Sequence, residues 1–137
     1  MAEEDMMLKA GRRLFKIGIL IALIVGLYQA YTLTTAEPFF STNVGSYIAW
    51  IIAIIGAIIG ILAFMGKGTI TKKEIPAFLM AGIALLIMGG IFPLSTYAMI
   101  PSYIGDIFAG VSMSLAIFVA PAVGILAIKA IWDIGKD

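Results

Sequence analysis

The sequence predicts an all-α fold of four hydrophobic, membrane-type helices that run up and down, and three observations predict it. The composition is 62% hydrophobic and only 12% charged, far from that of a soluble globular domain. Four apolar stretches, at roughly 14–33, 47–65, 77–97 and 107–132, come close to the 20 or so residues that a membrane span needs. Finally, all nine basic residues fall on one side of the resulting zigzag.

Each apolar stretch is expected to be helical, because a chain in hydrocarbon must satisfy its own backbone hydrogen bonds. The alternating polarity of a membrane β-barrel is absent. The connections are short and leave no room for a separate soluble domain. We therefore predict a single domain over residues 1–137, built from one helical hairpin at 14–65 and another at 77–132.

The first stretch has an alternative interpretation as a signal peptide, since basic residues precede it and the small residues Thr34 and Ala36 follow it. Its acidic start at residues 3–5 and its length are atypical of a signal peptide. We expect it to be a retained helix.

Glycine and proline mark the predicted boundaries. The run 66–69 should end the second helix, Pro76 should lie in the first turn of the third, and Pro101 should separate the third from the fourth. Pro93 and Pro121 fall inside predicted spans, where each removes a helical hydrogen bond. Both are expected to bend their helices.

Short segments recur in the same order in the two halves of the chain. Residues 21–23 recur as 83–85, residues 46–48 as 102–104, and residues 60–63 as 124–127. The preserved order favours two duplicated hairpins in the same orientation, a parallel repeat. Chance matches in so restricted an alphabet are the other interpretation.

Small residues recur at about every fourth position along three of the predicted helices. They are Gly18, Ala22, Gly26 and Ala30 on the first, Gly56 and Gly60 on the second, and Ser112, Ala116, Ala120 and Gly124 on the fourth. Such stripes let helix backbones approach closely in lipid, where no hydrophobic effect drives helices together. The stripes fit packing within one bundle, and they also fit packing between copies.

The chain lacks two of the residue types most often used in catalysis. The chain contains no histidine and no cysteine, which removes Ser-His-Asp and thiolate nucleophiles and imidazole or thiolate metal clusters. We predict no enzymatic activity, no cofactor and no metal site. The polar side chains within the spans, among them Gln29, Ser112 and Ser114, are expected to make structural hydrogen bonds.

Three charged residues near helix ends have structural interpretations. Asp106 is expected to cap the start of the fourth helix. Lys129 and Asp133 are four residues apart, the spacing of an ion pair on one helix face.

The basic side is the candidate functional surface. Its residues are Lys9, Arg12, Arg13, Lys16, Lys67, Lys72, Lys73, Lys129 and Lys136. In a cell membrane this segregation would keep both termini and the middle loop cytoplasmic. The same face would suit a container lying against nucleic acid, through sequence-independent contact with phosphates. We therefore predict contact with nucleic acid or another anionic surface.

The chain resembles the small, hydrophobic, helical major coat proteins of spindle-shaped archaeal viruses. The resemblance lies in the two apolar hairpins, the helices rich in Gly, Ala and Ile, the basic loop at 67–73 and the near absence of a soluble part. It implies a non-enzymatic coat subunit that assembles with many copies of itself into a virion shell around double-stranded DNA. Lipid is a further candidate partner. The alternative is a small four-span cellular membrane protein with cytoplasmic termini, acting as an accessory subunit or an oligomeric channel.

Overall fold

The computed structural model describes residues 2–33, 37–68, 70–91 and 102–136, and the described chain contains four α-helices and no strand. The helices are α1 (Ala2–Leu33), α2 (Asn43–Phe64), α3 (Ile75–Ile91) and α4 (Ser102–Lys136). A single turn of 3₁₀ helix, η1 (Phe39–Ser41), precedes α2 and was not predicted. The all-α, four-helix fold class is confirmed.

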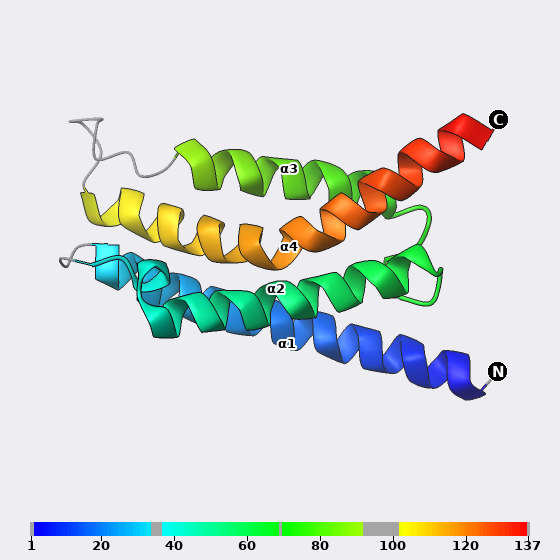
Figure 1. Cartoon of the computed structure of the whole chain (residues 1–137), viewed down its shortest axis with the longest axis horizontal. Coiled ribbons are helices and arrows are strands. Elements are labelled where there is room, and N and C mark those ends of the chain that lie inside the picture. The colour runs from blue at the N-terminus through cyan, green and yellow to red at the C-terminus, as the bar shows by residue number, and fades with distance from the viewer. Residues whose placement is uncertain (1, 34–36, 69, 92–101, 137) are drawn as a thin grey trace.

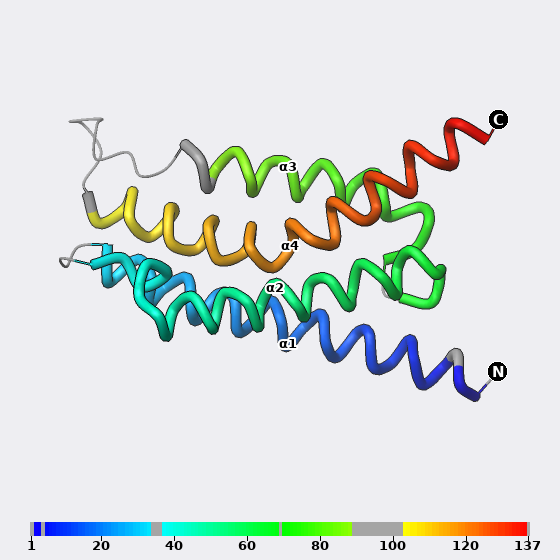
Figure 2. The backbone as a smooth tube through the Cα atoms, viewed as in Figure 1, coloured from blue at the N-terminus to red at the C-terminus, as the bar shows by residue number. Residues whose placement is uncertain are grey.

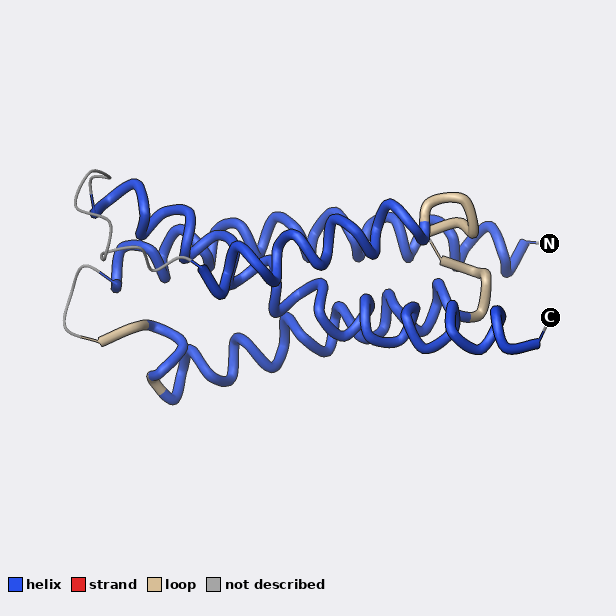
Figure 3. Tube along the Cα trace, turned by 90° about the horizontal axis from the view of Figure 1, so that it is seen from above, coloured by secondary structure: helices blue, strands red, loops and turns tan. Residues whose placement is uncertain are grey.

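The four helices run up and down (Figure 1). α1 and α3 point one way and α2 and α4 the other, so that both termini and the α2–α3 connection lie at the same end of the bundle. The view from above shows the same arrangement (Figure 3).

α4 is the central helix. It packs against α1, α2 and α3, whereas α3 contacts no other helix within the described residues. The two hairpins therefore pack differently. Gly60 lies against Ala122, while its counterpart Gly124 faces open space. Duplication of the hairpin stays a prediction.

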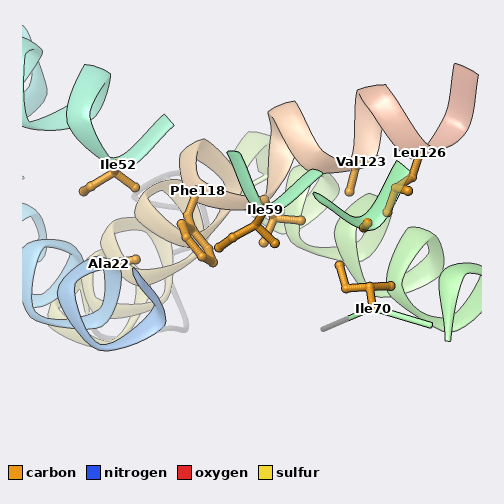
Figure 4. Close-up of a cluster of buried hydrophobic side chains, with 9 residues drawn as sticks. Ala22, Ile52, Ile59, Ile70, Phe118, Val123 and Leu126 are labelled. Carbon is orange, nitrogen blue, oxygen red and sulfur yellow. The ribbon is translucent and has the colours of Figure 1, made fainter. Parts of the chain in front are cut away.

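The core follows the inner face of α4 (Figure 4). Phe118 is its largest fully buried side chain, and Ile52 and Ile59 of α2 and Ala22 of α1 belong to the same buried cluster. Ile70 joins this cluster from the α2–α3 connection, so the connection is packed onto the bundle as well as linking two helices.

α1 and α4 extend beyond the predicted spans. Their 32 and 35 residues correspond to about 48 and 52 Å of helix, against a hydrocarbon thickness of about 30 Å. α1 starts at Ala2 rather than near residue 14 because its acidic and basic start is rich in Met, Leu, Glu, Lys and Arg, which are good helix formers. Three helices, α1, α2 and α4, are long and apolar enough to cross a membrane, and the described part of α3 is shorter.

The predicted end of α2 is confirmed. Gly66 has a φ of 74°, and the N–H groups of Gly66 and Lys67 donate to the carbonyls of Ala63 and Leu62, each at 3.0 Å. This pair of bonds is the Schellman motif, which satisfies carbonyls at a helix end and favours glycine at the left-handed position.

The starts of α2 and α3 use a hydroxyl and a carboxylate group. The Thr42 hydroxyl accepts a hydrogen bond from the Gly45 N–H at 3.1 Å at the start of α2. Before α3, the Glu74 carboxylate accepts from the Thr71 N–H at 3.0 Å. Pro76 is the second residue of α3, as predicted.

Pro121 lies inside α4, and the helix changes direction in its orange middle section (Figure 2). The predicted bend is therefore present. Pro93 and Pro101 lie outside the described residues.

The predicted cap at Asp106 was wrong. α4 begins at Ser102, so Asp106 is its fifth residue and its side chain is half-buried. The sequence misled because the apolar run begins just after Asp106, whereas the helix extends into the more polar residues before it.

Candidate anion-binding end of the bundle

The described structure places all nine predicted basic residues in the half of the bundle where both termini emerge, here called the basic end. They come from the first half of α1, the α2–α3 connection and the last turns of α4, which lie together where both termini emerge (Figures 1 and 3). Three segments far apart in sequence thus contribute to one surface. Its role in anion binding stays a prediction.

Four of these residues form a stripe along α1. At 100° per residue, Lys9, Arg12, Arg13 and Lys16 fall within an arc of about 100°, and all four side chains are exposed. Phe15, on the other side of the helix, packs against the core. The stripe therefore faces outward from the bundle.

The α2–α3 connection contributes the next group. Lys72 and Lys73 are exposed and Lys67 is half-buried. The adjacent acid, Glu74, accepts the hydrogen bond from the Thr71 N–H, so its carboxylate helps to fix the connection.

Lys129 differs from the other basic residues. Its Nζ donates to the Phe64 carbonyl at 2.6 Å and lies 5.3 Å from the centre of the Phe64 ring. It thereby satisfies a carbonyl at the end of α2 and ties α4 to α2. The predicted ion pair between Lys129 and Asp133 was wrong, since none joins these two described residues.

The predicted small-residue stripes mostly pack inside the subunit. A Cβ on Gly56 would overlap the Phe118 carbonyl oxygen, and one on Gly26 would lie 2.7 Å from the Val111 Cα. A Cβ on Gly60 would lie 2.7 Å from the Ala122 Cα. These close backbone approaches, together with those of Gly18 and Gly82 to α4 side chains, are here called the α4 seam.

The other predicted stripe residues divide between buried and outward positions. Ala22, Ala30, Ser112 and Ala116 are buried, Ala120 is half-buried and Gly124 is exposed. A methyl group added to Gly124 would meet no described atom within 4 Å, so this end of the α4 stripe is open to a neighbouring molecule.

The opposite end is held by buried polar groups. Gln29 is 1% exposed, and its Oε1 accepts from the Phe40 N–H at 3.0 Å. The Thr32 hydroxyl accepts from the Phe39 N–H at 3.0 Å and donates to the Gln29 carbonyl at 2.8 Å. The predicted structural role of Gln29 is confirmed, whereas the contribution of Thr32 was not predicted.

Ser114 is the exception among the polar groups predicted to be satisfied. Its side chain is fully buried, and its Oγ has no hydrogen-bond partner within the described residues. It lies at the crossing of α1 and α4, where a Cβ on Gly26 would lie 3.2 Å from the Ser114 Cβ.

No family model, curated protein or solved structure matches this chain. The resemblance to spindle-shaped virus coat proteins therefore stays a prediction from the sequence.

Proposed function

We propose that this protein is a non-enzymatic, self-assembling structural subunit, the major coat protein of a virion whose apolar shell surrounds double-stranded DNA. In this proposal the basic end faces the DNA and the apolar helices contact neighbouring copies or lipid.

The observation that carries the proposal is the separation of charge from apolar surface. All nine basic residues are at the basic end. The charged residues outside it are Glu37, before η1, and Asp106, near the start of α4. A repeated subunit of this kind would present positive charge on one face of a layer, which suits sequence-independent contact with phosphates.

The outer surface of the bundle supports assembly into an apolar layer. Large hydrophobic side chains are exposed along α1 and α2, including Leu20, Ile24, Ile51 and Ile54, each more than half exposed. Soluble monomers rarely expose such continuous apolar surface. In the proposed coat, lipid or further copies of the chain cover it.

Electron microscopy of native, detergent-free material tests the proposal, combined with nuclease treatment before and after disruption. Regular tubes or spindles containing nuclease-protected DNA would support it. Isolated bundles in ordinary bilayer with no protected DNA would overturn it.

A substitution at Gly124 makes the same test more specific. Because Gly124 faces open space, Gly124→Leu should leave the fold intact while blocking close approach of a neighbouring copy. Loss of particles with unchanged helicity is expected for a coat, and Leu23→Ala is the control outside the stripe. Normal particle yield from Gly124→Leu would remove this surface from the assembly.

A second candidate function is that of a small cellular membrane protein, as an accessory subunit or an oligomeric channel. The α4 seam favours it, because most of the small-residue surface is used within one subunit. In that case, both termini would be cytoplasmic, and co-purification of a distinct membrane complex would separate it from the coat.

A further inference from the structure

The first half of α1 carries an amphipathic groove on its outer side. Its volume is about 450 Å³, and it is lined by Met6, Lys9, Ala10, Arg13, Leu14 and Ile17. Lys9 and Arg13 are four residues apart and therefore adjacent on the helix surface. The groove thus places two positively charged side chains next to an apolar strip.

The position of the groove along α1 matches the headgroup layer of a bilayer. Residues 17–33 of α1 contain no charged side chain and span about 25 Å at 1.5 Å per residue, close to the hydrocarbon thickness of about 30 Å. With Ile17 at the hydrocarbon boundary, Arg13 and Lys9 lie about 6 and 12 Å further out along the helix. Their long side chains can reach the same layer by snorkelling.

The groove opens on the side of the bundle and not at its end. Its centre is about 150° around α1 from the side formed by Phe15, Gly18 and Ala22, which packs on the core. Met6 and Ile17 are 71% and 53% exposed. A ligand in this groove would lie beside the bundle, where lipid is found, rather than across its end, where a polymer such as DNA would pass.

We propose that this groove binds an anionic phospholipid. Lys9 and Arg13 contact the headgroup phosphate, for which a guanidinium offers paired donors, while the acyl chain lies along Leu14 and Ile17. This inference rests on the proposed function only in requiring apolar surroundings for α1. It assigns a ligand to two of the nine basic residues and leaves the others, apart from Lys129, to the DNA.

The test uses the full chain in lipid nanodiscs that contain equal mole fractions of phosphatidylglycerol and phosphatidylcholine. Native mass spectrometry of the released protein counts the lipids that remain bound. The double variant Lys9→Gln/Arg13→Gln should lose the preference for phosphatidylglycerol by about tenfold, because both headgroup contacts in the groove are removed.

The matched control is Arg12→Gln/Lys16→Gln. It removes the same charge from the same exposed helix segment, but neither residue lines the groove. Its preference should stay within about twofold of the parent, because neither side chain contacts a headgroup held in the groove, and diffuse charge alone would lower the preference equally in both variants. Arg13→Lys should retain the preference, and unchanged thermal unfolding in each variant would show that the fold is kept.

Equal losses from the two double variants would overturn the proposal, because they would indicate diffuse attraction instead of a site. A second copy of the chain that occupies the groove in place of lipid would also overturn it, as would short duplex DNA that competes with lipid for the groove residues.

Nuclease protection measured on the same variants separates the lipid-site proposal from the coat proposal. Lost lipid preference with retained DNA protection supports the lipid site, and absent shells with intact lipid preference would contradict the coat function alone.

Discussion

The α4 seam and the basic end respond to opposite physical constraints. In the seam, glycine backbones lie against α4 so closely that a single methyl group would overlap a neighbour. At the basic end, most charged side chains are exposed and come from three separate segments. Single substitutions in the seam should therefore change the stability of the fold strongly. At the basic end, each charge removed should weaken anion binding by a small step, and the size of that step should depend on the salt concentration.

The largest effect is expected for Gly56→Ala. Its methyl group would overlap the Phe118 carbonyl oxygen. This overlap can be relieved only by a backbone shift, because the methyl group is attached directly to the α2 backbone and the atom that it meets belongs to the α4 backbone. We expect destabilisation by about 2–3 kcal/mol, measured by denaturant unfolding in detergent micelles.

Gly124→Ala is the matched control, since it makes the same change in a helix where nothing lies within 4 Å. It should be neutral or stabilising by up to about 1 kcal/mol, because alanine is the better helix former. Equal effects at the two glycines would contradict the tight packing of α2 on α4.

The next largest effect is expected for Gln29→Leu at the end opposite the basic residues. The change removes the side-chain oxygen of Gln29, which is 1% exposed, and leaves the N–H of the half-buried Phe40 without its acceptor. An unsatisfied buried donor costs about 1–3 kcal/mol. Hydrogen exchange should also show faster exchange of the Phe40 amide, while the amides of the α2–α3 connection keep their rates.

The seam could be predicted only in part from the sequence. The four-residue spacing of small residues identified Gly18, Gly26, Gly56 and Gly60 as packing positions, because that spacing follows from helix geometry alone. It did not identify their partners, since contact between Gly56 and Phe118 joins positions 62 residues apart. The choice between packing within a subunit and between copies also required the three-dimensional arrangement.

The basic end was predicted better as a surface than as a set of equivalent residues. Charge segregation requires only the order of the spans, which hydropathy supplies. The difference between Lys129 and Lys136 depends on where α2 ends relative to α4, and no local pattern indicates it. The start of α1 was missed because the hydropathy of residues 2–13 is low although their helix propensity is high.

Lys129 belongs to the basic end but also holds two helices together, so substitutions there compare the two roles. Lys129→Met removes the donor to the Phe64 carbonyl and should destabilise the fold by about 1 kcal/mol. Lys136→Met removes the same charge from an exposed position in the last turn of α4 and should leave stability unchanged. Thermal unfolding in micelles compares the two variants, and equal melting temperatures would show that the bond contributes nothing.

The smallest effect on stability is expected for the triple variant of the α2–α3 connection, Lys67→Gln/Lys72→Gln/Lys73→Gln. Two of these side chains are exposed and one is half-buried, and surface substitutions usually change stability by no more than about 0.5 kcal/mol each. Retention of nucleic acid should nevertheless weaken, and the slope of log affinity against log salt should fall by up to about 0.9 for each phosphate that is no longer neutralised. Filter binding of duplex DNA across a salt series measures both quantities. Unchanged affinity and slope would exclude this connection from the DNA-facing surface, whereas a changed unfolding midpoint with an unchanged slope would place these lysines with Lys129 among the residues that hold the bundle together.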